Sequence, residues 1–403
     1  MSGAGRAGYA RIIRAAALVA FALFVFSSTF SIAATQTSLA IGIVLWAAAA
    51  ALYPGLRPKR TPIDSPLLFF VAASLVSTAL SGDPAGAAWN LRNYLLFAAV
   101  WYAAACAADG VMRRRFFTVL AVSATGSAVY GIAVFLLGRG EGTLGRTPGS
   151  FSTAMTYGGI MMLLLSVMLA VAIAPGTGRR ARILPAIAAA AAAAALWFSF
   201  TRSSWVAMLF SAVVILAVLR RRWIAPALAL VVIGVLLLPP AQRHRVTSIW
   251  DPNYRTNVQR IEMIRGGASI FLEHPVFGTG PVDLGEIYRA HMPPGAVYVH
   301  GHMHNIFLQV AVTLGIVGLA AFLWLLVSIV RTVAGLLRLD LPPPERAWAA
   351  GCLGATAGFI VNGLFEWNFG DAEVLTLWLI LIGSCAALRR DPSLTRRGRP
   401  VVS

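Results

Sequence analysis

The sequence predicts an all-α integral membrane protein with about twelve transmembrane helices and one large loop on the outer side of the membrane. Hydrophobic residues make up 58% of the 403-residue chain and charged residues only 12%, whereas about a quarter of the residues in a soluble domain are charged. The apolar residues also form repeated blocks long enough to cross a hydrocarbon core of about 30 Å as helices. These observations exclude a water-soluble enzyme, a disordered tail and a nucleic-acid-binding domain.

The apolar blocks are separated by short links that contain Arg, Gly and Pro. The first block resembles a secretory signal peptide, but a second block follows it at once, so we interpret it as an uncleaved first span. The predicted spans are residues 12–33, 37–54, 65–81, 88–108, 115–138, 153–174, 182–200, 204–220, 223–240, 305–330, 346–367 and 371–389.

Basic residues set the predicted orientation. Groups such as Arg113, Arg114 and Arg115 recur in every second link, which is typical of the cytoplasmic side of a membrane. An even number of spans then predicts that both termini are cytoplasmic, in a bacterial inner membrane, and that the long polar loop is periplasmic. The formal net charge of +18 therefore reflects orientation, and no nucleic-acid partner is expected.

The chain is predicted to divide into residues 1–240 with nine spans, a periplasmic loop domain at 241–304, and residues 305–403 with three spans and a cytoplasmic tail. Loops of this length are usually functional, and this one contains all six histidines. Further arginines lie in outer loops or near the outer ends of spans. Their position opposes the rule that basic residues gather on the cytoplasmic side, so they need another explanation. They are Arg92, Arg139, Arg146, Arg202, Arg243, Arg245, Arg255, Arg260, Arg265 and Arg289.

Three alternating histidines, His300, His302 and His304, precede Asn305 and a long apolar helix. His304 is expected at the positive N-terminal end of that helix. Imidazoles at such spacing can bind zinc, but no cysteine lies nearby and the surrounding arginines repel a cation. Solvated loop histidines followed by an Asn cap are a second alternative. We favour a general base, because His titrates near neutral pH.

Arginines stand out in three outer segments. Arg202 lies in a tight link between two spans, where an unpaired charge is costly and is a functional candidate. Arg260 and Arg265 are five residues apart on a predicted helix over 257–272, about 140° around its axis; a solvated pair between Glu262 and Arg265 is the alternative. Arg92, inside the fourth span, either has a function or extends toward the lipid headgroups.

Acidic residues gather between the last two spans, at Glu366, Asp371 and Glu373. The Asp-x-Glu pair could hold a divalent ion, but we favour Asp371 as the cap of the last span and Glu373 as a complement to its dipole. These carboxylates are equally suited to orienting sugar hydroxyls or to pairing with an outer arginine.

Several of these segments together resemble the O-antigen ligase family, which belongs to one membrane superfamily with O-antigen polymerases and pilin O-oligosaccharyltransferases. The resemblance covers roughly residues 140–390. It is carried by T-R-S-S-W at 201–205, R-I-E-M-I-R at 260–265, H-P-V-F-G-T-G at 274–280 and H-M-H-N-I-F-L-Q at 302–309. It implies a glycosyltransferase C-type fold and transfer of an undecaprenyl-pyrophosphate-linked glycan to the lipid A core oligosaccharide, on the periplasmic face and without a metal ion.

The resemblance also implies roles for residues of this chain. The family's essential histidine falls on His304, and its essential arginines fall on Arg202 and Arg265. This sequence departs from the pattern in two places: His302 is a second candidate base, and Arg260 is a second candidate pyrophosphate ligand. The predicted substrate-binding residues are Arg260, Arg146, Arg92, His302, Asn305 and Glu366.

The implied chemistry suits these residue types. Arginine binds phosphate through two parallel hydrogen bonds, and fixed arginine charges stabilise a departing pyrophosphate. A histidine base activates the acceptor hydroxyl, and attack opposite the leaving group inverts the anomeric carbon. The sequence has no nucleotide motif, so no cofactor is expected, and membrane lipids are the expected surroundings.

Three other functions remain open. An O-antigen polymerase and a protein O-oligosaccharyltransferase share the donor chemistry and differ in the acceptor. A twelve-helix anion transporter belongs to another class, but transporters usually place their charges near the bilayer midplane, whereas these arginines gather at one face.

We expect EDTA to leave glycan transfer unchanged, because guanidinium groups rather than a metal ion are predicted to neutralise the diphosphate. The first outer loop, around Thr35, also lacks the acidic pair that metal-dependent relatives of this broad fold carry. The measurement is transfer in membranes before and after chelation. A loss that Mg²⁺ or Mn²⁺ restores would favour metal binding by the histidines or by Asp371 and Glu373.

Overall fold

The computed structural model describes residues 3–52, 57, 59–142, 145–391 and 394. This part of the chain is helical and has one isolated β-bridge, between Glu141 and Arg146. The helices are α1 Gly3–Ser27, α2 Ile32–Leu52, α3 Asp64–Ala79, α4 Pro84–Asn90, η2 Leu91–Phe97, α5 Ala98–Cys106, α6 Gly110–Leu136, α7 Ala154–Ile173, α8 Arg179–Phe198, α9 Arg202–Leu219, η3 Arg221–Trp223, α10 Ile224–Leu237, α11 Pro240–Thr247, α12 Arg255–Glu273, α13 Gly285–Ala290, α14 Ile306–Leu336, α15 Pro343–Asn362 and α16 Ala372–Arg390.

Each predicted span coincides with helix in the structure, although residues 88–108 divide into α4, η2 and α5. Within the described residues, seven helices are long and apolar enough to cross a membrane: α2, α6, α7, α8, α9, α14 and α16. The prediction of an all-α, multi-pass membrane protein is therefore confirmed, whereas the count of twelve crossings stays a prediction. The end of the second predicted span and most of the predicted cytoplasmic tail lie outside the described residues.

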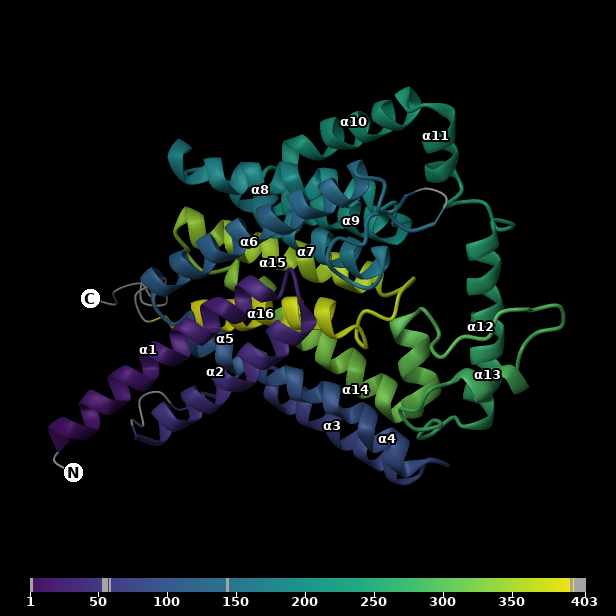
Figure 1. Cartoon of the computed structure of the whole chain (residues 1–403), viewed down its shortest axis with the longest axis horizontal. Coiled ribbons are helices and arrows are strands. Elements are labelled where there is room, and N and C mark those ends of the chain that lie inside the picture. Colours follow the sequence, from purple (N-terminus) through teal and green to yellow (C-terminus); the bar gives the residue numbers. More distant parts are fainter. Residues whose placement is uncertain (1–2, 53–56, 58, 143–144, 392–393, 395–403) are drawn as a thin grey trace.

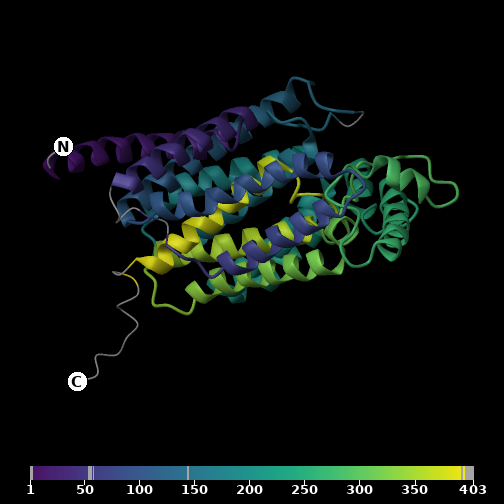
Figure 2. The same ribbon diagram turned by 90° about the horizontal axis from the view of Figure 1, so that it is seen from below.

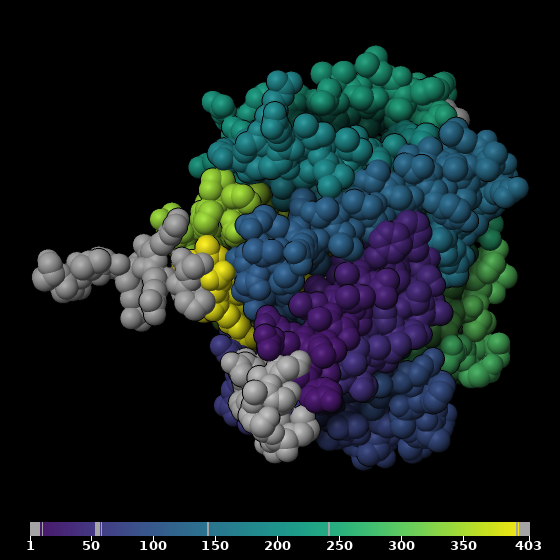
Figure 3. Space-filling view, turned by 60° about the vertical axis from the view of Figure 1, so that its left-hand side comes forward, coloured from purple at the N-terminus to yellow at the C-terminus, as the bar shows by residue number. Residues whose placement is uncertain are grey.

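The long helices run side by side as a bundle. The beginning of α1 and the end of α16 lie at one end of this bundle, and α12 and α13 lie at the other (Figures 1 and 2). The predicted loop at 241–304 therefore contains helices, among them α12 and α13, which lie at that end of the bundle. The first two helices, purple in Figure 3, lie on the outside of the molecule.

Helices α7 and α16 form the centre of the bundle. In an 18-residue apolar stretch of each helix, 78% of α7 and 83% of α16 is buried inside the protein. Glycines allow α15 to pack closely between its neighbours. A Cβ on Gly354 would lie 2.5 Å from Cγ1 of Ile215 in α9, and one on Gly358 would lie 2.5 Å from the sulfur of Met162 in α7. Such close contact between small residues and a neighbouring helix is the main source of packing energy inside a membrane.

Helix α14 is interrupted at Gly315, where the backbone takes a φ of 63°. The segment 275–280 packs into this break, and the backbone N–H of Ile316 donates a 2.8 Å hydrogen bond to the carbonyl oxygen of Pro275. A Cβ on Gly315 would lie 2.2 Å from the carbonyl oxygen of Val276. The H-P-V-F-G-T-G motif therefore fastens the outer helices to α14.

Replacing Gly315 by Ala should destabilise the protein by about 2 kcal/mol or more, because the new Cβ meets backbone and the residue keeps a positive φ. The measurement is thermal unfolding of the purified protein in detergent. Gly234→Ala in α10 is the matched control, since a Cβ there meets nothing within 4 Å. Equal stability of the two variants would contradict this account of the break.

Candidate active site

The three alternating histidines lead directly into α14. Asn305 is the N-cap of this helix: its side-chain oxygen accepts hydrogen bonds from the backbone N–H groups of Phe307 and Leu308, as predicted for Asn at this position. The N–H of Ile306 donates to the carbonyl oxygen of Gly363 at 2.7 Å. This bond brings the start of α14, and His304 with it, beside the segment that follows α15.

Glu366 holds the ring of His304. The Nδ1 atom of His304 lies 3.1 Å from Oε2 of Glu366, and Glu366 is only 7% exposed. Because a carboxylate accepts hydrogen bonds, Nδ1 donates in this contact, and the uncharged form of the ring then has its lone pair on Nε2. Nε2 has no hydrogen-bond partner among the residues that the structure describes. His304 also has a φ of 43°, a backbone conformation that is uncommon for a residue other than glycine.

The second oxygen of Glu366 binds two residues from other parts of the fold. Nη2 of Arg260, on α12, donates to Oε1 at 3.1 Å, and the hydroxyl of Ser203, on α9, donates to it at 3.4 Å. Arg260 also donates to the carbonyl oxygen of Phe365. Glu366 therefore links α9, α12 and the entrance of α14 at a single buried carboxylate.

Arg202 is buried at the start of α9 and is held by residues that precede and begin α12. Its Nη1 atom donates to the carbonyl and hydroxyl oxygens of Ser248 at 2.7 and 2.8 Å. Its Nη2 atom donates to Thr256 and, at 3.2 Å, to Asn257. The guanidinium lies over the ring of Tyr254, 4.4 Å from its centre. Because all of these partners are uncharged, they hold the guanidinium without neutralising it.

Two further arginines lie next to Arg202. Nε of Arg146 donates to the carbonyl oxygen of Ser199 at 3.1 Å, and Nη2 of Arg245 donates to that of Phe200 at 3.1 Å. Burial and repulsion by Arg245 lower the pKa of Arg146, which is the direction expected for cations crowded in a poorly hydrated region. Such a region attracts an anion. We call this group the arginine cluster, which consists of Arg146, Arg202, Arg245 and Arg260.

His302 lies beside His304, and the centres of the two rings are 4.2 Å apart. Burial and repulsion by His304 lower the pKa of His302 to about 4, so its imidazole is uncharged at neutral pH. Its Nδ1 atom accepts the backbone N–H of His304 at 3.4 Å. Because Glu366 orients His304 and not His302, the geometry favours His304 of the two candidate bases.

Two predicted site residues lie outside this arrangement. Arg265 is exposed on α12 and has no side-chain hydrogen bond or ion pair with the described residues. Arg92 is also exposed; it donates to the carbonyl oxygen of Trp89 and lies over the Trp89 ring at 4.5 Å. The 140° that separates Arg260 from Arg265 on a helix explains why only Arg260 reaches Glu366.

The acidic residues between the last two spans separate into two roles. Asp371 caps α16 by accepting hydrogen bonds from the N–H groups of Glu373 and Val374, as predicted, and it also accepts a bond from Thr156. Glu366 pairs with an outer arginine, one of the alternatives that the sequence left open. In the described parts of the chain, no group of three or more His, Cys, Asp and Glu side chains is placed to hold a metal ion.

The structure adds site residues that sequence reasoning did not select. In the sequence, Arg245 is only one of the outer arginines, Ser203 stands out only as part of T-R-S-S-W, and Tyr254 is not a predicted site residue. Tyr254 contacts Arg202 with its ring, while its hydroxyl accepts a 2.9 Å hydrogen bond from Arg245. One signal in the sequence could have indicated Arg245: like Arg202 and Arg260, it is a basic residue on the predicted outer side of the membrane.

A comparison with known families matches part of the chain. Residues 187–323 match the family model described as O-antigen ligase. This stretch of the chain is similar to the O-antigen ligase family. The resemblance expected from the sequence is thus confirmed over residues 187–323, which contain Arg202, Arg260 and His304, whereas Arg146 and Glu366 lie outside this stretch. A search of curated proteins finds no match to this chain.

The O-antigen ligase family implies an enzyme of the glycosyltransferase type, with lipid-linked glycan and membrane substrates. The contacts above suit a substrate site of this kind in one respect: a partly buried group of arginines lies near the uncharged imidazole of His302. Fold and family do not by themselves assign roles to individual residues.

Acid should destabilise this protein through His302. Its pKa is about 4 in the folded protein and 6.5 ordinarily, so between these values the unfolded chain binds more protons. The free energy of unfolding should therefore fall as the pH drops from 6.5 toward 4, by at most about 1.4 kcal/mol per pH unit from this group. The measurement is the thermal midpoint from pH 7 to pH 4.5 for wild type and His302→Gln, with the exposed His244→Gln as control. Identical pH dependence of wild type and His302→Gln would contradict the prediction.

Proposed function

We propose that this protein is an O-antigen ligase that transfers an undecaprenyl-pyrophosphate-linked glycan to the lipid A core oligosaccharide. The observation that carries the proposal is the contact between Glu366 and both His304 and Arg260, next to the rest of the arginine cluster. A base oriented by a carboxylate, with fixed cations beside it, suits the transfer of a sugar from a diphosphate to a hydroxyl.

The arginine cluster binds the diphosphate of the donor. Arg202 and Arg260 line a common cavity of about 30 Å³ together with Ser203, Asn257 and Phe365, which has room for one water molecule. A diphosphate is larger, so donor binding requires side chains at this cavity to move. Guanidinium groups suit the ligand because they form paired, charge-assisted hydrogen bonds with phosphate oxygens.

His304 is the general base. Its Nε2 atom takes the proton of the acceptor hydroxyl while the hydroxyl oxygen bonds to the anomeric carbon of the donor glycan. The bond from that carbon to the pyrophosphate oxygen breaks, and the pyrophosphate leaves on its lipid with its charge stabilised by the arginines. Glu366 stabilises the imidazolium that forms, as a carboxylate does in a catalytic triad. Attack opposite the leaving group inverts the anomeric carbon.

The proposed topology follows the orientation of the basic loops. Twelve crossings of a bacterial inner membrane place both termini in the cytoplasm. The region at 241–304, which includes α12 and α13, and the start of α14 then face the periplasm, where the donor and the lipid A core meet. No metal ion or cofactor takes part in this proposal.

The decisive experiment is reconstitution of the purified protein in liposomes with a lipid-linked glycan and lipid A core. Capping of the core supports ligase activity. Growth of the glycan on the donor lipid would instead identify the protein as a polymerase. Transfer of the glycan to a pilin peptide would identify it as an O-oligosaccharyltransferase. Appearance of donor inside the liposomes without any new glycosidic bond would assign a transporter.

In the same assay, His304→Ala should lower the transfer rate by about 10²–10⁴-fold, the usual contribution of a general base. Arg260→Ala should lower transfer far more than Arg265→Ala, because Arg260 contacts Glu366 and Arg265 is exposed on the other side of α12. Membrane insertion and thermal stability are measured for each variant. Full activity of His304→Ala would transfer the role of base to His302, and a larger effect of Arg265→Ala would make Arg265 the diphosphate ligand, as the family resemblance implies.

A further inference from the structure

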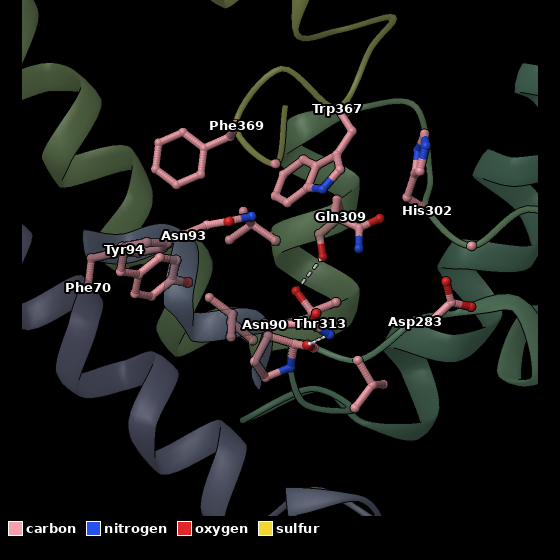
Figure 4. A pocket seen from close by; sticks show the side chains of 16 residues that line it. Phe70, Asn90, Asn93, Tyr94, Asp283, His302, Gln309, Thr313, Trp367 and Phe369 are labelled. Carbon is pink, nitrogen blue, oxygen red and sulfur yellow. Dashed lines mark hydrogen bonds between the residues drawn. The ribbon is translucent and has the colours of Figure 1, made fainter. Parts of the chain in front are cut away.

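A second cavity, of about 270 Å³, lies next to His302, between the start of α14 and the segment of α4 and η2. Side chains from distant parts of the sequence point into it, among them Tyr94, Gln309 and Trp367 (Figure 4). The cavity is slightly smaller than sites for drug-sized ligands, which measure about 300–1,000 Å³. It therefore has the dimensions for a single sugar ring rather than for a long lipid chain.

The lining combines aromatic faces with polar groups. Phe70, Tyr94, Trp367 and Phe369 provide rings, and Asn90, Asn93, Asp283 and Gln309 provide amides and a carboxylate. The side chain of Asn93 has no hydrogen-bond partner among the described residues. An apolar wall with a few fixed polar groups is the usual composition of a small-molecule site, and a sugar ring offers both an apolar face and hydroxyl groups.

The charge of this cavity is opposite to that of the arginine cluster. Asp283 lies in its lining, and no arginine or lysine is among the described residues that form it. The consecutive residues Phe365, Glu366 and Trp367 separate the two regions. Phe365 lines the cavity of Arg202 and Arg260, Trp367 lines the second cavity, and Glu366 binds His304 between them. A phosphate is therefore favoured on one side of His304 and disfavoured on the other.

We propose that the second cavity binds the acceptor sugar, an uncharged ring at the end of an oligosaccharide, and that Asn93 and Trp367 determine its specificity. This inference rests on the proposed transferase function. The nucleophilic hydroxyl must approach from the face opposite the departing pyrophosphate. His302 lines the second cavity and lies beside His304, with the ring centres 4.2 Å apart, whereas Arg202 and Arg260 line the other cavity. The sugar stacks on the Trp367 ring, Asn93 and Asp283 bind its hydroxyl groups, and Asp283 repels a phosphorylated acceptor ring.

The first test is steady-state kinetics in liposomes, with lipid A core and lipid-linked donor varied independently. Asn93→Ala and Trp367→Ala should each raise the KM for the acceptor by about tenfold, the effect of one or two lost contacts, and leave the KM for the donor unchanged. Trp367→Phe keeps an aromatic face and should lie between Trp367→Ala and wild type. A raised KM for the donor alone, or no change in either KM, would overturn the inference.

Matched controls come from the same outer surface. Asn253→Ala and Trp89→Ala change exposed residues of the same types outside the cavity, and both should leave the two KM values unchanged. An effect of these controls as large as that of Asn93→Ala or Trp367→Ala would show that the cavity is not the cause and would overturn the inference.

The second test is binding without turnover, which separates this inference from the proposed function. Radiolabelled lipid A core is titrated onto the detergent-solubilised protein in the absence of donor. Asn93→Ala should weaken its binding about tenfold, and Asp283→Asn should strengthen binding of a core whose terminal sugar is phosphorylated. Failure of the wild type to cap the core would overturn the ligase proposal alone, whereas equal core binding by wild type and Asn93→Ala would overturn the acceptor site alone.

Discussion

A buried carboxylate is the constraint on which the rest of the site depends. Glu366 is only 7% exposed, and removing an ionised carboxylate from water costs several kcal/mol unless partners satisfy it. Its partners are Arg260 on α12, Ser203 on α9 and His304 before α14. Because these come from three separate segments, satisfying the carboxylate also fixes how the outer helices sit on the bundle, and it orients the imidazole.

The arginine cluster retains its positive charge because most of its hydrogen-bond partners are uncharged. Arg202 is held by the carbonyl and side-chain oxygens of Ser248 and Asn257, and by the ring of Tyr254. These contacts fix the guanidinium in place and leave its charge available to a ligand. Charges arranged in advance need little reorganisation when a pyrophosphate departs, which is how electrostatic stabilisation of a transition state is most effective.

The outer segment is rigidly joined to the membrane helices. A small apolar cluster of Met263, Ile270, Leu284, Tyr288 and Met303 also includes Val312 of α14, and the segment 275–280 fills the break of α14 at Gly315. The H-P-V-F-G-T-G motif therefore joins the outer segment to α14 through backbone contacts. This attachment places α12, with Arg260, against the residues that follow α15.

The sequence by itself determined the helices, the membrane class, the resemblance to the O-antigen ligase family and the start of α14 after Asn305, because apolar blocks, caps and short motifs are local patterns. It also singled out Arg202, His304 and Glu366. Only the tertiary structure decided that Arg260 rather than Arg265 contacts Glu366, that Arg245 and Tyr254 complete the cluster around Arg202, and that a second cavity adjoins His302. Glu366 is separated from Arg260 by 106 residues and from His304 by 62. Contacts of this kind depend on how the helices pack, and the spacing of residues along the chain does not predict that packing.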